Sequence, residues 1–350
     1  MTQTEKDDVV FKTSQDVKDY APGRKRLFSA THEEIRSGAT ADVYFVRTQE
    51  ILEREGKADT VVTVEIFSGR SGIVAGTPEC LELLRGLPLE VWGMDEGEPF
   101  SERDTILRIT GPYSSFGRYE TALLGILASS SGWATAAREC RNAVPDAPFY
   151  CFGARHIHPA VASVMERAAV VGGADGAACI LGAKLAGLEP VGTIPHALVL
   201  ILGDTVKTAL AYNTYMPPDA PRTILVDTFH DEAEEALRVA EVLGKDMGAV
   251  RLDTPAERGG VTEGLVREVR ARLDLAGFDH VRIFVSGGLN PERMQRLREA
   301  GADAFGVGHY ISSARPLDMT MDIKAIEGRP IAKRGRIPGT VHNPRLKRMA

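Results

Sequence analysis

The sequence predicts an α/β protein in which a small β-rich domain precedes a larger domain of repeated βα units. From residue 60 to residue 113, apolar runs rich in β-branched residues are separated by acidic and Gly/Pro turns such as DEGEP. After residue 147, short apolar runs alternate with amphipathic stretches over about 160 residues, which predicts a parallel sheet, closed or doubly wound.

The first third of the chain contains the weaker signals. Residues 1–30 are charged and show little periodicity. In TADVYFVRT (40–48), Asp42 either caps a helix or shares one face of an extended stretch with Tyr44 and Val46. Strands are expected at 60–67, 87–92 and 105–109, and helices at 119–128 and 134–140, joined by a turn at the Ser-rich SSSGW.

The second part of the chain is expected to alternate strands and helices throughout. Amphipathic helices fall at 161–171, 231–244 and 262–276. Buried strands are expected at 149–152, 176–180, 190–194, 223–226, 249–252, 283–285 and 304–307.

A glycine-rich turn follows each of the last two expected strands. Between the turns, Asn290 can cap a helix that has Pro291 in its first turn. Both turns fall at the same end of adjacent strands, so their backbone N–H groups favour a phosphate ligand, with ordinary tight turns as the alternative. The residues concerned are Ser286, Gly287 and Gly288 in the first turn, and Gly306, Gly308 and His309 in the second.

Polar side chains also follow several of the other expected strands. Because the carboxyl ends of parallel strands converge on one face of a barrel, these residues are expected to form one site. That convergence predicts an enzyme. The residues are Arg155 with His156, His196, Asp227 with Thr228, and Arg251 with Asp253.

Composition limits the class of protein. The 350 residues are 43% hydrophobic, enough for a large core, and the net charge of −6 argues against a broad nucleic-acid surface. The four cysteines show neither CxxC nor zinc spacing, which favours a reduced, cytoplasmic setting. No third ligand accompanies His156 and His158, so no metal site is expected. The polar amino terminus and the short apolar run at 197–202 predict neither a signal peptide nor a membrane span.

Several stretches together resemble nicotinate phosphoribosyltransferase, of the type II phosphoribosyltransferase group, in its short archaeal and bacterial forms. The resemblance implies an amino-terminal α/β sandwich (1–118), an irregular TIM-like α/β barrel (119–315) and a carboxyl-terminal segment (316–350) that returns to the sandwich. It also implies a homodimer or higher oligomer with sites shared between subunits. The matching stretches, in family order, are TADVYFVRT, FGARHIHPA, VGGADGAACILGAKLAG, EPVGTIPHALV, LVDTFHDEA, VRLDT, FVSGGLN and FGVGHYIS.

The same resemblance implies transfer of the 5-phosphoribosyl group of phosphoribosyl pyrophosphate to nicotinate in NAD biosynthesis, giving nicotinate mononucleotide and pyrophosphate. Mg²⁺ would accompany the pyrophosphate, and ATP would be a co-substrate that phosphorylates His196. Phe152, with Tyr44 of a neighbouring subunit, would stack on the pyridine ring. The resemblance places the remaining residues as follows: Arg155 on an anion, Thr193 and Thr228 near the substrates, Arg251, Asp253 and Asp227 near the ribose and leaving group, and both glycine turns on phosphate.

The chain departs from the family pattern at one position, and several alternative functions remain to be weighed. Many family members have a second arginine where this chain has His156, which leaves the anion bound by Arg155 undetermined. Quinolinate phosphoribosyltransferase shares the fold, but its dicarboxylate substrate demands more cations and no phosphorylatable histidine, so GTIPHAL favours nicotinate. A catalytically silent barrel that binds a nucleotide or sugar phosphate is a further alternative. A sugar-phosphate isomerase or aldolase would not need the preceding sandwich.

Overall fold

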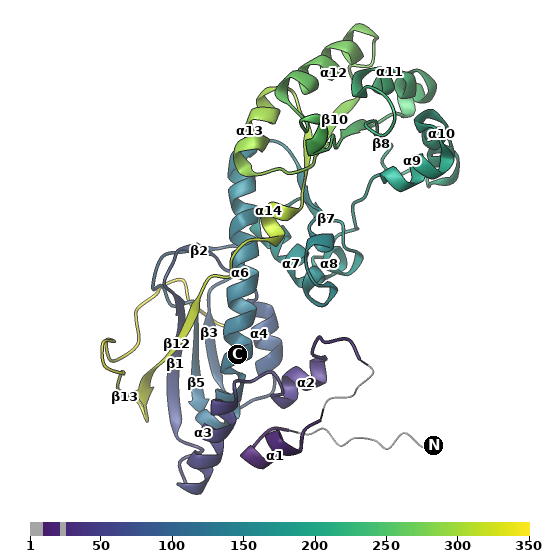
Figure 1. Cartoon of the computed structure of the whole chain (residues 1–350). Coiled ribbons are helices and arrows are strands. Elements are labelled where there is room, and N and C mark those ends of the chain that lie inside the picture. The colour runs from purple at the N-terminus through teal and green to yellow at the C-terminus, as the bar shows by residue number, and fades with distance from the viewer. Residues whose placement is uncertain (1–9, 22–25) are drawn as a thin grey trace, which may run out of the picture. The chain divides into compact units, whose positions relative to one another are not determined.

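The computed structural model describes residues 10–21 and 26–350 and divides the chain into two compact units (Figure 1). The first unit consists of Met1–Gly132 and Arg315–Ala350, and the second of Trp133–Ala314. Both units combine helices with one main sheet, antiparallel in the first and parallel in the second. The predicted fold class, an α/β sandwich followed by a barrel-like α/β domain, is confirmed.

The sheet of the first unit joins the two ends of the chain. Its order is β13-β12-β1-β5-β3-β14, and every neighbouring pair is antiparallel. The register along β12 and β1 runs from Val62 opposite Ile326 to Ser68 opposite Met319, so the carboxyl-terminal segment completes this sheet. The strands are β1 (Val61–Ser68), β3 (Glu90–Gly93), β5 (Leu107–Pro112), β12 (Met319–Ile326), β13 (Arg329–Pro330) and β14 (Lys347–Arg348), with β2 (Gly72–Ile73) and β4 (Pro99–Phe100) as a separate pair.

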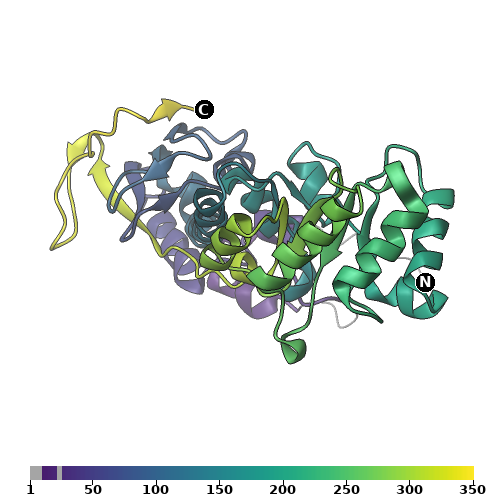
Figure 2. The same cartoon turned by 90° about the horizontal axis from the view of Figure 1, so that it is seen from above.

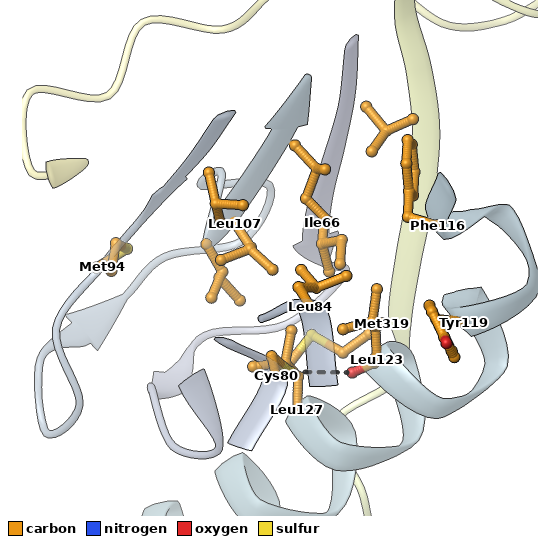
Figure 3. Close-up of a cluster of buried hydrophobic side chains, with 14 of the residues drawn as sticks. Ile66, Cys80, Leu84, Met94, Leu107, Phe116, Tyr119, Leu123, Leu127 and Met319 are labelled. Atoms are coloured by element: carbon orange, nitrogen blue, oxygen red, sulfur yellow. Dashed lines mark hydrogen bonds between the residues drawn. The ribbon is translucent and has the colours of Figure 1, made fainter. Parts of the chain in front are cut away.

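Helices cover one face of this sheet and enclose the core of the first unit. Ile66 of β1 and Leu107 of β5 are fully buried, together with Cys80 and Leu123 from two covering helices (Figure 3). The Cys80 thiol donates to the Leu123 carbonyl at 3.8 Å. The helices of this unit are α1 (Ser14–Asp19), α2 (His32–Ser37), α3 (Val43–Arg54), α4 (Thr77–Leu84), α5 (Tyr113–Phe116), the 3-10 turn η1 (Gly117–Tyr119) and the start of α6 (Glu120–Ala143). Of the two readings of residues 40–48, the helical one is right.

Basic residues near the carboxyl terminus fold back onto the same sheet. Asp322 of β12 is buried, and its carboxylate pairs with Lys333 at 2.7 Å and with Arg336 at 2.8 Å. The Arg336 guanidinium also lies 5.4 Å from the centre of the Phe67 ring. These cations therefore already have partners within the first unit.

The turn expected at SSSGW does not form, because α6 continues through these residues. Ser131 is fully buried, and its hydroxyl accepts a hydrogen bond from the backbone N–H of Ala75 at 3.2 Å. A Cβ atom at Gly132 would lie 2.5 Å from the carbonyl oxygen of Arg315. Tertiary packing thus explains the serine and the glycine, whose local preference for a turn is overridden.

The second unit is built on a six-stranded parallel sheet of order β7-β6-β11-β10-β9-β8. The strand expected at 190–194 does not form, although Val191 N–H donates to the Ala177 carbonyl at 2.9 Å. A strand there would lie between β7 and β8 and close the barrel, so this irregular stretch leaves the barrel incomplete. The strand expected at 176–180 is also shorter than predicted. The strands are β6 (Phe149–Cys151), β7 (Gly176–Ala177), β8 (Thr223–Leu225), β9 (Ala249–Leu252), β10 (Arg282–Ser286) and β11 (Ala304–Val307).

Helices connect these parallel strands, and α11, α12 and α13 follow one another along one side of the sheet (Figure 2). Asn290 caps α13 as predicted, accepting from the Arg293 N–H at 2.8 Å. No helix in the described part of the chain is long and apolar enough to span a membrane. The helices are α7 (Pro159–Gly172), α8 (Ile180–Leu185), α9 (His196–Leu202), α10 (Thr205–Tyr215), α11 (Glu232–Leu243), α12 (Glu263–Leu275), α13 (Pro291–Glu299) and α14 (His309–Ser312), with 3-10 turns η2 (Ala154–His156), η3 (Gly244–Asp246) and η4 (Ala256–Arg258).

Two glycines of α6 provide a matched test of this packing. Gly125→Ala is expected to raise the free energy of unfolding by about 0.5–1 kcal/mol, because a Cβ atom there meets no other atom within 4 Å and alanine favours the helix. Gly132→Ala is expected to lower it, since the new methyl group would clash with the Arg315 backbone. Urea unfolding followed by circular dichroism measures both changes. Equal stabilisation by the two variants would contradict the close approach at Gly132.

Candidate active site

A cavity of about 600 Å³ opens in the second unit, next to the carboxyl ends of the strands. Arg155 reaches it from η2, and its side chain makes no hydrogen bond or ion pair with any described residue. The cavity combines apolar walls with an unpaired cation, as expected for a site that binds an organic anion. Its lining residues are Phe152, Ala154, Arg155, Glu166, Ala178, Cys179, Val191, Gly192, Thr193, Pro195, His196, Ala197, Leu225, Arg251 and Asp253.

Arg251 of β9 holds several of these elements together. Its guanidinium donates to Ser286 Oγ at 2.9 Å, to Thr193 Oγ1 at 2.6 Å and to Asp253 Oδ2 at 3.1 Å. The guanidinium carbon also lies 5.6 Å from the centre of the Phe152 ring. Burial lowers the pKa of Arg251, an effect that Asp253 opposes. The side chain is therefore fixed within the site.

His196, the first residue of α9, lies between a hydroxyl group and two carboxylates. Its Nδ1 is 3.1 Å from Thr228 Oγ1, while its Nε2 is 3.6 Å from Asp227 Oδ2 and 3.8 Å from Asp253 Oδ2. The four residues come from three separate stretches of sequence, and the structure brings them together as predicted.

The two carboxylates beside His196 have different surroundings. Asp253 accepts hydrogen bonds from Ser286 Oγ at 2.8 Å and from Arg251. The Asp227 side chain is 0% exposed, and neither of its carboxylate oxygens has a hydrogen-bond partner among the described residues. Burial raises the pKa of Asp227 to about 6, although His196 opposes this effect. Asp227 is thus an acceptor without a donor, as expected where a ligand hydroxyl binds.

The glycine turns lie against the same residues. Gly287 and Gly288 have φ values of 90° and 58°, which favour glycine. A Cβ atom at Gly306 would lie 2.6 Å from the Phe152 ring, and one at Gly308 would lie 2.9 Å from His156 Nε2. Close packing therefore explains why residues 306 and 308 are glycine, and positive φ angles explain the glycines at 287 and 288.

Several predicted site residues are not part of the cavity lining: Tyr44, Asp227, Thr228, Ser286, Gly287, Gly288, Gly306, Gly308 and His309. Of these, Asp227 and Thr228 lie beside His196, and Ser286 is hydrogen-bonded to Arg251 and Asp253. His309 begins α14, and its ring lies 5.8 Å from the ring of His156. Tyr44 belongs to α3 of the first unit and is 55% exposed.

Sequence reasoning missed Glu166 and Cys179, which line the cavity. Glu166 is fully buried on α7, beside the buried residues Met165 and Ala169. A charged residue on the apolar face of a predicted helix was the signal that could have revealed it, since such residues are seldom buried without a partner.

Two family models together match most of the chain. Residues 42–131 match the amino-terminal domain of quinolinate phosphoribosyl transferase, and residues 133–322 match its carboxyl-terminal domain.

Individual relatives extend this similarity over most of the chain. The crystal structure of nicotinate-nucleotide pyrophosphorylase from Pyrococcus furiosus is 45% identical, with a TM-score of 0.86, and the match covers 90% of this chain and 82% of that one. A nicotinate phosphoribosyltransferase of Mycobacterium tuberculosis is 26% identical over 355 residues, covering 89% of this chain and 78% of the relative. A probable carboxylating nicotinate-nucleotide pyrophosphorylase of Methanothermobacter thermautotrophicus is 23% identical over 303 residues. That match covers 84% of this chain and 99% of the relative.

These findings contradict the expected nicotinate phosphoribosyltransferase and its use of ATP. Both family models and the Pyrococcus furiosus structure point to the quinolinate enzyme, which does not take ATP as a co-substrate. The expected Mg²⁺ has no evident protein site, since the described residues include no group of three or more His, Cys, Asp or Glu able to hold a metal.

Asp227 should make stability depend on pH in an unusual direction. Its folded-state pKa of about 6 lies above the ordinary aspartate value of 3.8, so ionised Asp227 destabilises the fold above pH 6. This penalty disappears as the pH falls through the interval between those values. Asp227→Asn is therefore expected to raise the free energy of unfolding at pH 8 by about 2 kcal/mol, and to have little effect at pH 4.

Urea unfolding from pH 4 to pH 8 measures the difference. Asp253→Asn is the control with the opposite sign, because it deprives the largely buried Arg251 guanidinium of its partly buried carboxylate partner. A destabilising effect of Asp227→Asn at pH 8 would show that Asp227 has a partner in the free protein.

Proposed function

The chain belongs to the quinolinate phosphoribosyl transferase family, and we propose that it transfers the 5-phosphoribosyl group of phosphoribosyl pyrophosphate to quinolinate. The ring nitrogen attacks C1′ of the ribose, and pyrophosphate leaves with the electrons of the broken C1′–O bond. The carboxylate on ring carbon 2 then departs as CO₂. Its bonding electrons stay on that carbon, beside the cationic nitrogen, until a proton is taken up. Nicotinate mononucleotide is the product.

The observation that carries the proposal is the presence of two arginines on one cavity, of which Arg155 has no partner. Quinolinate has two adjacent carboxylates, and a guanidinium can bind a carboxylate through two parallel hydrogen bonds. Arg155 binds one carboxylate, and the fixed guanidinium of Arg251 lies on the same cavity, where Asp253 balances its charge. Phe152 offers an aromatic surface to the pyridine ring.

The ribose and phosphate groups have their own proposed partners. Asp227 accepts a hydrogen bond from a ribose hydroxyl, which supplies the donor that it lacks. His196, Thr193 and Thr228 bind near the reacting carbon, where positive charge develops as pyrophosphate leaves; Asp227 and Asp253 stabilise that charge. The phosphate partners are the backbone groups of the two turns, namely Ser286, Gly287 and Gly288, and Gly306, Gly308 and His309.

A second copy of the chain is proposed to complete the site through Tyr44. This tyrosine is largely exposed and lies outside the barrel unit, so it is available to another subunit. The proposed assembly is a homodimer in which two equivalent sites are shared, since such interfaces are usually isologous.

The substrate is tested by a product assay with phosphoribosyl pyrophosphate and magnesium chloride, without ATP. Quinolinate carrying ¹⁴C in its 2-carboxylate is expected to yield one labelled CO₂ for each nicotinate mononucleotide. Nicotinate and nicotinamide are offered in parallel, and neither can release CO₂ in this way. Turnover of nicotinate with none of quinolinate would overturn the proposed substrate.

Arg155→Ala is expected to raise the KM for quinolinate by about 10- to 100-fold, because a hydrogen-bonded charge contributes about 1.5–3 kcal/mol. The KM for phosphoribosyl pyrophosphate should change much less. Arg272→Ala is the matched control, since Arg272 lies on α12, outside the cavity lining, and forms an exposed pair with Glu268. A larger rise in the KM for phosphoribosyl pyrophosphate than in the KM for quinolinate would place Arg155 on phosphate, and an equal rise in both would contradict a specific role on the pyridine acid.

The shared site is tested by mixing two inactive variants, Tyr44→Ala and His196→Ala, under conditions in which subunits exchange. Random pairing should restore about a quarter of wild-type activity, because half of the dimers are mixed and each has one intact site. Sedimentation confirms exchange. No recovery in exchanged dimers would place both residues in the site of a single chain.

A further inference from the structure

The carboxylate of Glu166 connects two turns that are distant in sequence. Glu166 is 0% exposed on α7. Its Oε1 accepts the N–H of Ala154 at 3.0 Å, and its Oε2 accepts the N–H of Cys179 at 2.5 Å. One backbone N–H group from each turn therefore donates to the same buried carboxylate.

These two turns are walls of the cavity described above. The first turn, 152–155, provides Phe152 and Arg155, and the second, 178–179, follows β7 directly. Glu166 itself lines the cavity between them. The separation of the two walls is thus set by the span of one carboxylate group.

Burial of this charge is unfavourable, since desolvation raises the pKa of Glu166 despite the backbone N–H groups that donate to it. An apolar residue would pack more favourably beside Met165 and Ala169, which are buried on the same helix. A carboxylate, unlike an apolar side chain, provides hydrogen-bond acceptors for the N–H groups of both turns.

We propose that Glu166 is a positioning residue that fixes the width of the pyridine-acid pocket by holding the 152–155 and 178–179 turns. The inference rests on the proposed function for the identity of the ligand, but the geometry of the two turns is independent of it. Glu166 itself makes no contact with a reacting atom.

The packing of α8 supports the same role. A Cβ atom at Gly182 would lie 3.1 Å from Glu166 Cβ and 3.2 Å from the Ser163 carbonyl oxygen. The helix that follows the second turn is therefore pressed against α7 beside Glu166. Gly182→Ala should displace this turn without altering any charge.

Glu166→Gln tests the proposal, because glutamine has the same shape but one of its terminal groups is a donor that would face a backbone N–H. The KM for quinolinate is expected to rise at least about tenfold, and the KM for phosphoribosyl pyrophosphate by less than about twofold. Glu235→Gln is the control, since Glu235 is equally buried and pairs with Arg238 away from the cavity lining.

Two further readouts do not need activity. Hydrogen exchange of the amides at 153–154 and 178–179 should become faster in Glu166→Gln. Cys179 should react faster with a thiol reagent, a signal specific to the second turn because Cys80, Cys140 and Cys151 are buried. Glu235→Gln should change neither rate.

The outcomes separate the two proposals. Unchanged exchange, thiol reactivity and KM in Glu166→Gln would overturn the positioning role. Faster exchange at both turns, with no quinolinate turnover by the wild-type protein, would support the role and reject the substrate. If Glu166→Gln does not fold, Gly182→Ala takes its place, with a smaller rise in KM and faster labelling of Cys179 expected; unchanged values would overturn the role.

Discussion

The hydrogen bonds of the buried Arg251 guanidinium are the interaction on which the candidate site depends. Residues 190–194 form no strand, so on that side the barrel lacks a continuous ladder, although Val191 N–H donates to the Ala177 carbonyl. Arg251 compensates by donating to Thr193 in this irregular stretch and to Ser286 at the end of β10. Because a guanidinium has five donors in a rigid plane, one side chain can fix several strand ends at once. Side-chain hydrogen bonds from Arg251 therefore connect these segments where backbone hydrogen bonds of a sheet do not.

This arrangement constrains the residues around it. Phe152 lies against Arg251 on one side and leaves no space for a side chain at Gly306 on another. A glycine on β11 is thus required by the aromatic ring of Phe152, which directly follows β6, the neighbouring strand in the sheet. Conformational freedom alone would not explain this glycine, whereas the turn at Gly287 and Gly288 needs positive φ angles.

Local patterns predicted the fold where local and tertiary preferences agree. Strand β9, strand β10 and the Asn290 cap of α13 follow from apolar runs and capping chemistry, and all three formed. The failures have a common physical cause, which is packing between distant residues. The Arg315 backbone packs so closely against α6 that no side chain fits at Gly132. The buried carboxylate of Glu166 receives its hydrogen bonds from two turns that are remote in sequence. The convergence of His196, Asp227, Thr228 and Asp253 was predictable from their places after strands. The choice of pyridine acid was not, because the chain resembles both nicotinate phosphoribosyltransferases and nicotinate-nucleotide pyrophosphorylases.

The two carboxylates beside His196 differ in whether they have hydrogen-bond donors in the free protein. Asp253 is saturated by Ser286 and Arg251, so it stabilises the site whether or not a ligand is bound. Asp227 is buried without a donor, and its raised pKa reports the free energy cost of that state. A hydroxyl group that donates to Asp227 favours the ionised form and so lowers this pKa. In the proposed complex, ligand binding and proton release are therefore linked at Asp227, because the ribose hydroxyl would relieve the unfavourable burial of its charge.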